Sequence, residues 1–271
     1  MFECREAVGA DCIAIESREI SVSYGARLVL DRMSIEVSAG AWTSVVGPNG
    51  CGKSTLLRAL AGLINPQRGS VWLQGRPLMS WPRRDRAKRV TWLAQTVSPS
   101  ALTASECVAL GRFAHTGWLG SCQAADDAAI QRAMSATGSL CWANRRLSTM
   151  SGGERQRVNL ARVLAVEASV LLLDEPTTHL DPPHQEEVIR LLREQTYGYG
   201  VTIVSAIHDL SLALMADRLL VIGSNGVIGH GTVREALRGD WLSQAFGTSI
   251  AIVRHGGAYL WQPHVSGRVH S

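Results

Sequence analysis

The fold of this chain is decided by one stretch, Gly47-Pro48-Asn49-Gly50-Cys51-Gly52-Lys53-Ser54. It matches the pattern G-x-x-x-x-G-K-S, whose backbone N–H groups and lysine surround phosphate groups. Residues 41–46 before it have a short buried-strand pattern, and residues 53–61 after it repeat leucine at helical spacing. A phosphate-binding loop requires this succession of strand, loop and helix, so we expect an α/β fold that binds a nucleoside triphosphate.

The composition is typical of a globular protein with a sizeable core. The 271 residues suffice for one large α/β domain or two small ones, and 46% of them are hydrophobic. The net charge of +4 is modest, so we expect no nucleic-acid partner, which would need a concentrated basic face. Among 27 basic residues only Lys53 and Lys88 are lysines, so a chance match to the loop pattern has a rate on the order of a per cent or less.

The cysteines and the hydropathy pattern exclude several other classes of protein. The six cysteines are scattered without a C-x-x-C pair, which argues against a zinc site or a disulfide framework and favours a reducing compartment. We expect no signal peptide in residues 1–12. We also expect no membrane span, because the longest apolar run, 158–173, contains Asn159, Arg162 and Glu167.

The order of strand and helix patterns indicates a mainly parallel sheet. Strand patterns cover residues 13–24, 33–37, 69–75, 90–94, 170–173 and 201–207. From about 98 to 147, Ala, Ser and charged residues replace the strand signal, which predicts a helical insertion. A helix predicted over 182–194 separates two later strands, as in parallel strands with crossover helices, and short elements over 219–261 complete the domain.

Two carboxylates follow the aliphatic strand Val170-Leu171-Leu172-Leu173. A strand this uniformly aliphatic is buried on both faces, and ligands bind at the carboxyl ends of strands in open α/β sheets. Together with the phosphate-binding loop, Asp174 and Glu175 therefore indicate a site for Mg²⁺ and for a general base.

The segment Met150-Ser151-Gly152-Gly153-Glu154 supports two interpretations at once. Ser151 and Glu154 form the S-x-x-E pattern of a capping box before an amphipathic helix. A capped helix N-terminus left bare by two glycines is also an anion-binding site.

These three motifs, in this order, resemble the ATP-binding-cassette (ABC) ATPases over roughly residues 13–253. The resemblance implies a P-loop NTPase fold with a mainly parallel core sheet, an antiparallel β subdomain and an inserted α-helical subdomain. One domain is expected over 13–262, with its core in 13–97 and 166–262 and the helical subdomain in 98–165. Residues 1–12 and 263–271 are expected to be flexible tails.

The resemblance also assigns roles to single residues. Nucleotide contacts are implied for Tyr24, Gly47, Pro48, Asn49, Gly50, Cys51, Gly52, Lys53, Ser54, Thr55, Ser151, Gly152, Gly153, Glu154 and Asp181. The expected catalytic residues are Glu175, His208 and Gln95, and the expected Mg²⁺ ligands are Ser54, Gln95 and Asp174. The family's signature segment usually begins with Leu and ends with Gln, where this chain has Met150 and Glu154.

Several of these residues also have ordinary structural interpretations. Tyr24 suits a half-buried tyrosine at a strand end as well as an adenine platform. Asp181 before a proline is a typical helix N-cap, and Asp209 is expected to cap the next helix. The basic run 83–89 is expected to be a solvated helix face, with proximity to lipid headgroups or a permease as the alternative.

Finer features resemble one branch of the family, the ATPases of iron-siderophore, haem and vitamin B12 importers. They are Thr103 with residues 110–112, and residues 177–181 with His184-Gln185. The resemblance implies ATP and Mg²⁺, a homodimer of cassettes, transmembrane permease subunits and, indirectly, a substrate-binding protein. It places the chain on the cytoplasmic face of the inner membrane, held there by the permease.

Other activities remain open at this point. The core motifs do not encode the direction of transport, so an exporter ATPase is one alternative. A soluble ABC ATPase acting on nucleic acid or ribosomes is another, although such relatives commonly carry two cassettes or a long coiled-coil insert. A small-molecule kinase would also use the loop, but the Ser151–Glu154 helix start and His208 argue against it.

Overall fold

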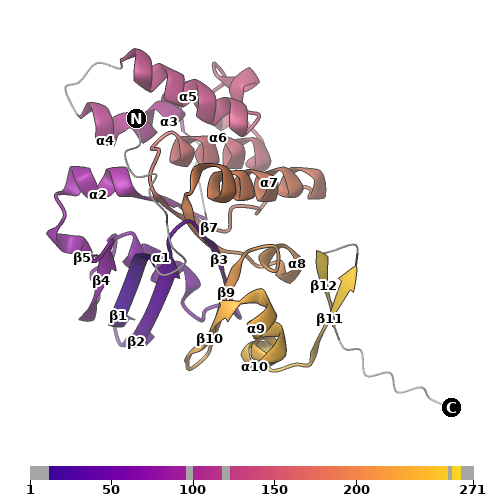
Figure 1. The fold of residues 1–271 in the computed structure, drawn as a ribbon. Helices are drawn as coiled ribbons and strands as arrows, with labels where there is room; N and C mark the ends of the chain where they lie inside the picture. Colours follow the sequence, from indigo (N-terminus) through magenta and orange to yellow (C-terminus); the bar gives the residue numbers. More distant parts are fainter. Residues whose placement is uncertain (1–11, 96–99, 118–122, 256–257, 264–271) are drawn as a thin grey trace.

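The computed structural model describes residues 12–95, 100–117, 123–255 and 258–263. Figure 1 shows a helical part at the top, a long helix beneath it, an antiparallel sheet at the lower left and the C-terminal elements at the lower right. No helix in these ranges is both long and apolar enough to cross a membrane.

The core is a six-stranded sheet in the order β10-β9-β3-β8-β7-β6. Its strands are β10 (Gly226–Thr232), β9 (Arg218–Gly223), β3 (Trp42–Val46), β8 (Thr202–Ala206), β7 (Val170–Asp174) and β6 (Val90–Leu93). All neighbours pair in parallel except β10, which runs antiparallel to β9. The prediction of a mainly parallel sheet is therefore confirmed.

A second sheet is antiparallel, in the order β2-β1-β4-β5. Its strands are β1 (Ile13–Tyr24), β2 (Arg27–Ser38), β4 (Arg68–Leu73) and β5 (Arg76–Pro77). A separate two-stranded sheet, β11 (Ile250–His255) with β12 (Ala258–Pro263), follows the short helices α9 (Val233–Arg238) and α10 (Trp241–Phe246).

The uniform leucines of β7 are explained by burial on both faces of the core sheet. Leu171 and Leu173 belong to the cluster that α7 (Pro182–Tyr199) covers, whereas Val170 and Leu172 belong to the cluster around α1 (Lys53–Leu60). Successive side chains of a strand point to opposite faces, so every position here contacts a hydrophobic layer. Helix α7 continues beyond the predicted residue 194 to Tyr199.

The helical part has a hydrophobic cluster of its own, built by α3 (Ala104–Ala109), α5 (Ala124–Ala136) and α6 (Gly152–Leu164). Short helices complete it: η2 (Leu110–Arg112), α4 (Phe113–Thr116), η3 (Leu140–Trp142) and η4 (Leu147–Thr149). A Cβ added to Gly111 would lie 2.3 Å from the carbonyl oxygen of Arg162, so only glycine lets η2 pack this closely on α6.

A buried arginine joins the helical part to the core. The Nε atom of Arg112 lies 2.8 Å from Oδ1 of Asp126, and its Nη1 atom lies 2.8 Å from Oε2 of Glu167. Nη1 also donates to the carbonyl oxygen of Ala165 at 2.8 Å. Arg112, in η2, therefore binds α5, the end of α6 and Glu167, which lies between α6 and the core strand β7, through charge-assisted hydrogen bonds.

The basic run forms α2 (Arg83–Arg89), which follows the short η1 (Leu78–Ser80) and buries none of its residues. The prediction of an exposed helix is confirmed, yet the helix is not only solvated. Arg84 donates to the carbonyl oxygens of Ala114 and His115, and the Arg89 guanidinium stacks 4.3 Å from the ring centre of Trp81.

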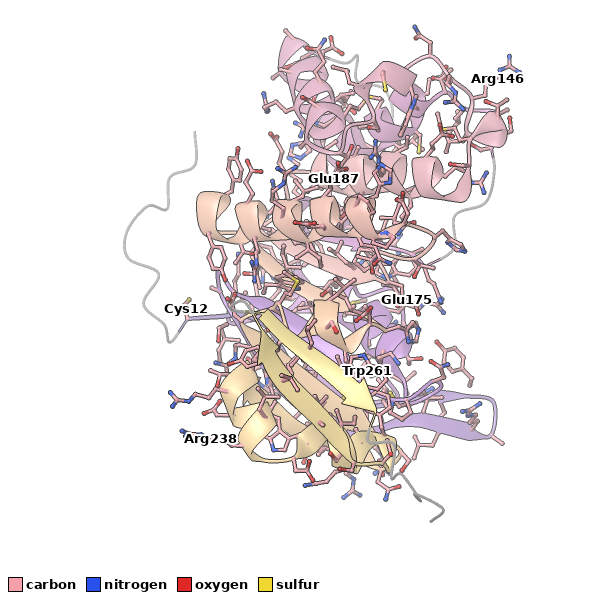
Figure 2. All side chains as sticks on the ribbon, turned by 90° about the vertical axis from the view of Figure 1, so that its right-hand side faces the viewer. Cys12, Arg146, Glu175, Glu187, Arg238 and Trp261 are labelled. Carbon is pink, nitrogen blue, oxygen red and sulfur yellow. The ribbon has the colours of Figure 1, made fainter. Side chains whose placement is uncertain are left out.

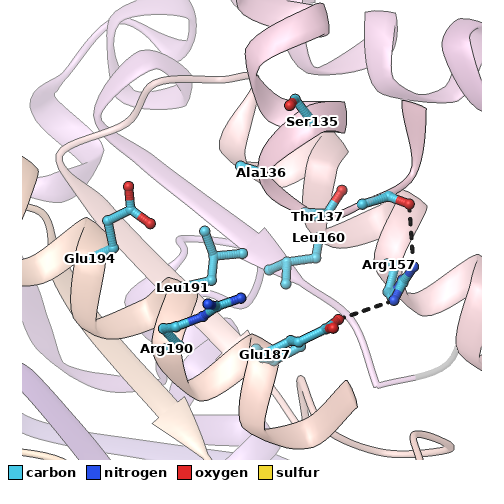
Figure 3. A pocket seen from close by; sticks show the side chains of 11 residues that line it. Ser135, Ala136, Thr137, Arg157, Leu160, Glu187, Arg190, Leu191 and Glu194 are labelled. Carbon is cyan, nitrogen blue, oxygen red and sulfur yellow. Dashed lines mark hydrogen bonds and ion pairs between the residues drawn. The ribbon is translucent and has the colours of Figure 1, made fainter. Parts of the chain in front are cut away.

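A cavity of about 390 Å³ lies between the helical part and α7. Figure 3 shows Arg157 at one side of it, with one hydrogen bond to the carbonyl oxygen of Gly138 and an ion pair with Glu187, both 3.2 Å long. The guanidinium of Arg157 also lies 4.8 Å from the ring centre of Trp142. At this cavity the two parts are joined by these polar contacts and by apolar packing of Leu160 in α6 with Val188 and Leu191 in α7.

Candidate nucleotide-binding site

The phosphate-binding loop lies between β3 and α1, as its sequence context predicts. Its glycines allow close contacts that no other residue permits. A Cβ on Gly47 would lie 2.1 Å from the carbonyl oxygen of Ile222, and one on Gly52, whose φ is 103°, would lie 2.7 Å from Cδ2 of Leu30. The loop is therefore packed between β9 and β2, with its backbone fixed ahead of the helix N-terminus.

Lys53 is buried and folds back over the loop. Its Nζ atom donates to the carbonyl oxygens of Gly47 at 2.7 Å and Pro48 at 3.0 Å. Among the described residues the ammonium group forms no ion pair, and these two loop carbonyls hold it at the loop.

A cavity of about 490 Å³ opens over the loop. Its lining comes from five separate parts of the chain: Tyr24, Arg27, Val29, Asn49, Gly50, Gly52, Lys53, Ser54, Thr55, Gln95, Glu175 and His208. The volume is within the range of small-molecule sites. The structure thus brings together Tyr24, Gln95, Glu175, His208 and six residues of the loop and the helix start, as the sequence predicts. The other predicted residues are outside this lining: Gly47, Pro48, Cys51, Ser151, Gly152, Gly153, Glu154, Asp174 and Asp181.

Asp174 and Ser54 meet directly beneath the cavity. The Ser54 hydroxyl donates to Oδ1 of Asp174 at 2.9 Å, while Oδ2 of Asp174 is buried with no hydrogen-bond partner in the described structure. Burial raises the pKa of the Asp174 carboxyl, and the neighbouring charge of Glu175 acts in the same direction. An unsatisfied carboxylate oxygen beside a hydroxyl has the hard oxygen chemistry that fits Mg²⁺.

Glu175 is fixed by its backbone and by two side-chain contacts. Its φ is 55°, a left-handed conformation, and its N–H donates to the carbonyl oxygen of Ala206 at 3.0 Å. Thr178 Oγ1 donates to Oε2 at 2.9 Å, and His208 Nε2 lies 2.5 Å from Oε1. In Figure 2, Glu175 lies below the helical part and α7. Both carboxylate oxygens are therefore oriented, as a general base requires.

The Ser151–Glu154 segment forms the predicted capping box. Glu154 N donates to Ser151 Oγ at 3.2 Å, and Ser151 N donates to Oε2 of Glu154 at 2.8 Å. Arg145 Nη1 lies 2.8 Å from Oε1 of Glu154, and this hydrogen bond leads the causes that lower the pKa of Glu154. Within the described chain, this segment does not line the cavity over its own phosphate-binding loop.

The loop after Glu175 packs on the capped helix. A Cβ on Gly153 would lie 3.1 Å from the carbonyl oxygen of His179. Asp181 occupies the N-cap position of α7 ahead of Pro182, but its side chain caps no helix N–H and pairs with His184 Nδ1 instead. The Asp209 side chain does cap its helix, α8 (Leu210–Ala213), by accepting from the N–H groups of Ser211 and Leu212.

Four residues of the site were not among the predicted nucleotide, metal or catalytic residues. Arg27 and Val29 enter the cavity from β2, and Thr178 holds Glu175. Gln156, buried on α6, donates to the carbonyl oxygens of Glu175 and Pro176 at 3.2 Å each. Thr178 lies inside the segment that resembled the importer branch, so its neighbourhood was the only hint in the sequence.

Fold and site together define a nucleoside triphosphatase built on a phosphate-binding loop. The family model described as ABC transporter matches residues 30–178, more than half of the chain, so the chain belongs to the ABC transporter family, and it is an ATPase.

Several curated relatives cover nearly the whole chain. The ferric enterobactin transport ATP-binding protein FepC of Escherichia coli is 35% identical over 88% of this chain and 89% of its own length. The hemin import ATP-binding protein HmuV of Streptomyces coelicolor is 42% identical over 91% of this chain and 89% of its own.

Solved structures agree on the fold. The dimeric structure of MJ0796, a bacterial ABC transporter cassette, has a TM-score of 0.73 at 25% identity and covers 81% of this chain and 99% of that one. A bacterial Atm1-family ABC exporter with ATP bound has a TM-score of 0.74 at 24% identity, covering 90% of this chain and 44% of that one. The same fold thus occurs in an exporter, so it does not indicate the direction of transport.

Proposed function

We propose that this chain is the ATP-hydrolysing subunit of an ABC importer for an iron chelate, a siderophore complex or haem. The observation that carries the proposal is the similarity, at 35–42% identity over most of both chains, to proteins named for ferric enterobactin transport and hemin import. The predicted cobalamin cargo has no counterpart among these names. The complete nucleotide cavity supports the same conclusion, because such a subunit must bind and hydrolyse ATP.

ATP binds over the phosphate-binding loop in this proposal, with its base at Tyr24 and its phosphates at the loop N–H groups and Lys53. Ser54, Asp174 and Gln95 hold Mg²⁺, which neutralises charge on the phosphate oxygens when it is bound. The partnerless Oδ2 atom of Asp174 supports this ligand set. Gln95 supports it more weakly, since it is exposed at the rim of the cavity.

Glu175 accepts a proton from the attacking water, and His208 holds the carboxylate in place and contacts the terminal phosphate. The 2.5 Å contact between the two side chains and the hydrogen bond from Thr178 support these roles. The reaction itself needs positioning and charge stabilisation more than covalent participation by the protein.

Two copies of the chain close over two ATP molecules, with Ser151, Gly152, Gly153 and Glu154 of one copy facing the ATP of the other. The position of this segment outside its own cavity supports the arrangement, as does the dimeric structure of MJ0796. Transmembrane permease subunits hold the cassettes at the cytoplasmic face of the inner membrane, and a substrate-binding protein delivers the cargo to them.

The test is uptake of labelled ferric siderophore and haem by cells that carry either the native chain or Glu175→Gln in place of the endogenous copy. Loss of uptake of one cargo in the Gln variant, with normal levels of the protein, supports the importer and names its substrate. Unchanged uptake of both cargoes, with ATPase activity abolished in vitro, contradicts the iron-chelate proposal.

A further inference from the structure

Arg27 stands in the nucleotide cavity and belongs to none of the motifs discussed above. It is the first residue of β2 and pairs directly with Tyr24, the last residue of β1, across a turn of two residues. Side chains of directly paired residues lie on the same face of a sheet, about 5 Å apart at Cβ. Tyr24 and Arg27 accordingly both line the cavity.

The guanidinium of Arg27 reaches from this turn to the phosphate-binding loop. A Cβ built on Gly50 would lie 3.7 Å from Nη2 of Arg27, so the cationic group lies over the crest of the loop. Strand β2, which carries Arg27, is fixed relative to the loop, because its residues Val29 and Leu30 pack against Gly52. Arg27 therefore extends from the side of the tyrosine toward Gly50 of the phosphate-binding loop.

The guanidinium of Arg27 has no hydrogen-bond, ion-pair or aromatic partner among the described residues, and the residue is exposed and lines the cavity. The other cation of the cavity floor, Lys53, is occupied by two loop carbonyls. A guanidinium that is unpaired, planar and rich in donors suits an anion with several oxygens.

We propose that Arg27 binds the phosphate chain of the nucleotide, as a second cation beside Lys53. The inference rests on the proposed function, since it assumes that ATP occupies this cavity. Tyr24 then contacts the base end and Arg27 the phosphate end, so that one β-turn recognises both ends of the ligand. Arg27 acts in binding and takes no part in proton transfer.

The experiment titrates the purified full chain in EDTA, so that ATP is not hydrolysed. Three probes are compared: ATP, inorganic triphosphate, which lacks the base and ribose, and adenosine, which lacks the phosphates. Arg27→Ala removes the cation and Arg27→Lys restores a point charge. Arg68→Ala is the matched control, because Arg68 is an exposed arginine of the same sheet that does not line the cavity.

We expect Arg27→Ala to weaken ATP and inorganic triphosphate by about tenfold, the loss of one charge-assisted hydrogen bond, and to leave adenosine unchanged. Arg27→Lys should recover part of the loss, and Arg68→Ala should bind as the native chain does. The dependence of ATP affinity on salt should become weaker in Arg27→Ala.

Two results would overturn the inference: equal weakening of adenosine and triphosphate, which would make Arg27 a base contact, or unchanged binding of all three probes. Thermal unfolding of each variant shows whether the fold is retained. If the native chain itself binds no ATP, the proposed function fails, and this outcome is distinct from a failure confined to Arg27.

Discussion

The Nε2 atom of His208 lies 2.5 Å from Oε1 of Glu175, although the two residues come from the ends of different strands, β8 and β7. The strands are neighbours and parallel, so their carboxyl ends meet at one edge of the sheet. The side chain of Glu175 is only 9% exposed, whereas that of His208 is 47% exposed. The carboxylate of Glu175 is thus largely buried, and the imidazole of His208 lies beside it, partly exposed to solvent.

Replacing Glu175 by Gln should lower ATP turnover by about 10²–10⁴-fold, the usual contribution of a general base, and leave ATP affinity unchanged. The amide keeps the shape and the contact with Thr178 but cannot accept the proton. Phosphate release and ATP titration in EDTA measure the two quantities. Glu186→Gln on the exposed face of α7 is the matched control, and native-like turnover in Glu175→Gln would remove Glu175 from the mechanism.

Replacing Asp174 by Asn should stabilise the metal-free fold while it abolishes Mg²⁺-dependent hydrolysis. Burial raises the pKa of this carboxyl, so the ionised form is disfavoured in the fold. The gain in unfolding free energy should be complete above the raised pKa and should vanish as pH falls below the ordinary value near 3.8. Urea unfolding in EDTA across this range measures it. A variant that is less stable than the native chain near pH 7 would show that the Ser54 hydrogen bond outweighs the burial.

Replacing Arg157 by Ala should cost about 1–3 kcal/mol of unfolding free energy. The change removes the hydrogen bond to Gly138, the pair with Glu187 and the stacking on Trp142, all at the boundary between the helical part and α7. Glu187→Gln removes only the pair, whose carboxylate is 53% exposed, and should cost less than about 1 kcal/mol. Urea denaturation compares the two variants, and equal costs would mean that the ion pair alone joins these elements.

His230 should make the native fold less stable as pH falls from about 6.5 to 4. Burial, followed by the nearby charge of Arg218, lowers its pKa to about 4. In this window the unfolded chain takes up a proton that the folded chain does not, so the unfolding free energy decreases with falling pH, by about 1–3 kcal/mol for this group. Comparing the native chain with His230→Gln isolates the contribution. His179→Gln, which changes an exposed histidine, is the control, and parallel pH profiles for the native chain and His230→Gln would contradict the prediction.

The elements that the sequence predicted well are those with a strong local signal. The phosphate-binding loop, the aliphatic β7 and the capping box at Ser151 each depend on neighbouring residues and on spacing, and the structure has them where they were expected. The end of α7 was placed five residues too early, because the helix continues through Gly198 and ends only where Gly200 turns left-handed at φ 70°. The Asp181 side chain was expected to cap α7 but pairs with His184. The N–H groups at the start of α7 and the His184 ring are both near Asp181 in the sequence, and spacing alone does not decide between them.

The sequence by itself determined the class of fold, the family and many of the residues that line the cavity over the phosphate-binding loop, because these depend on short motifs whose chemistry is local. Only the tertiary structure decided which distant residues meet. It placed Arg27 near Gly50, His208 against Glu175 and Gln156 against the backbone of Glu175. In the described part of the chain it also left one carboxylate oxygen of Asp174 without a hydrogen-bond partner. Those contacts follow from the order of strands in the sheet and from the packing of side chains across it, which act between segments far apart in the chain.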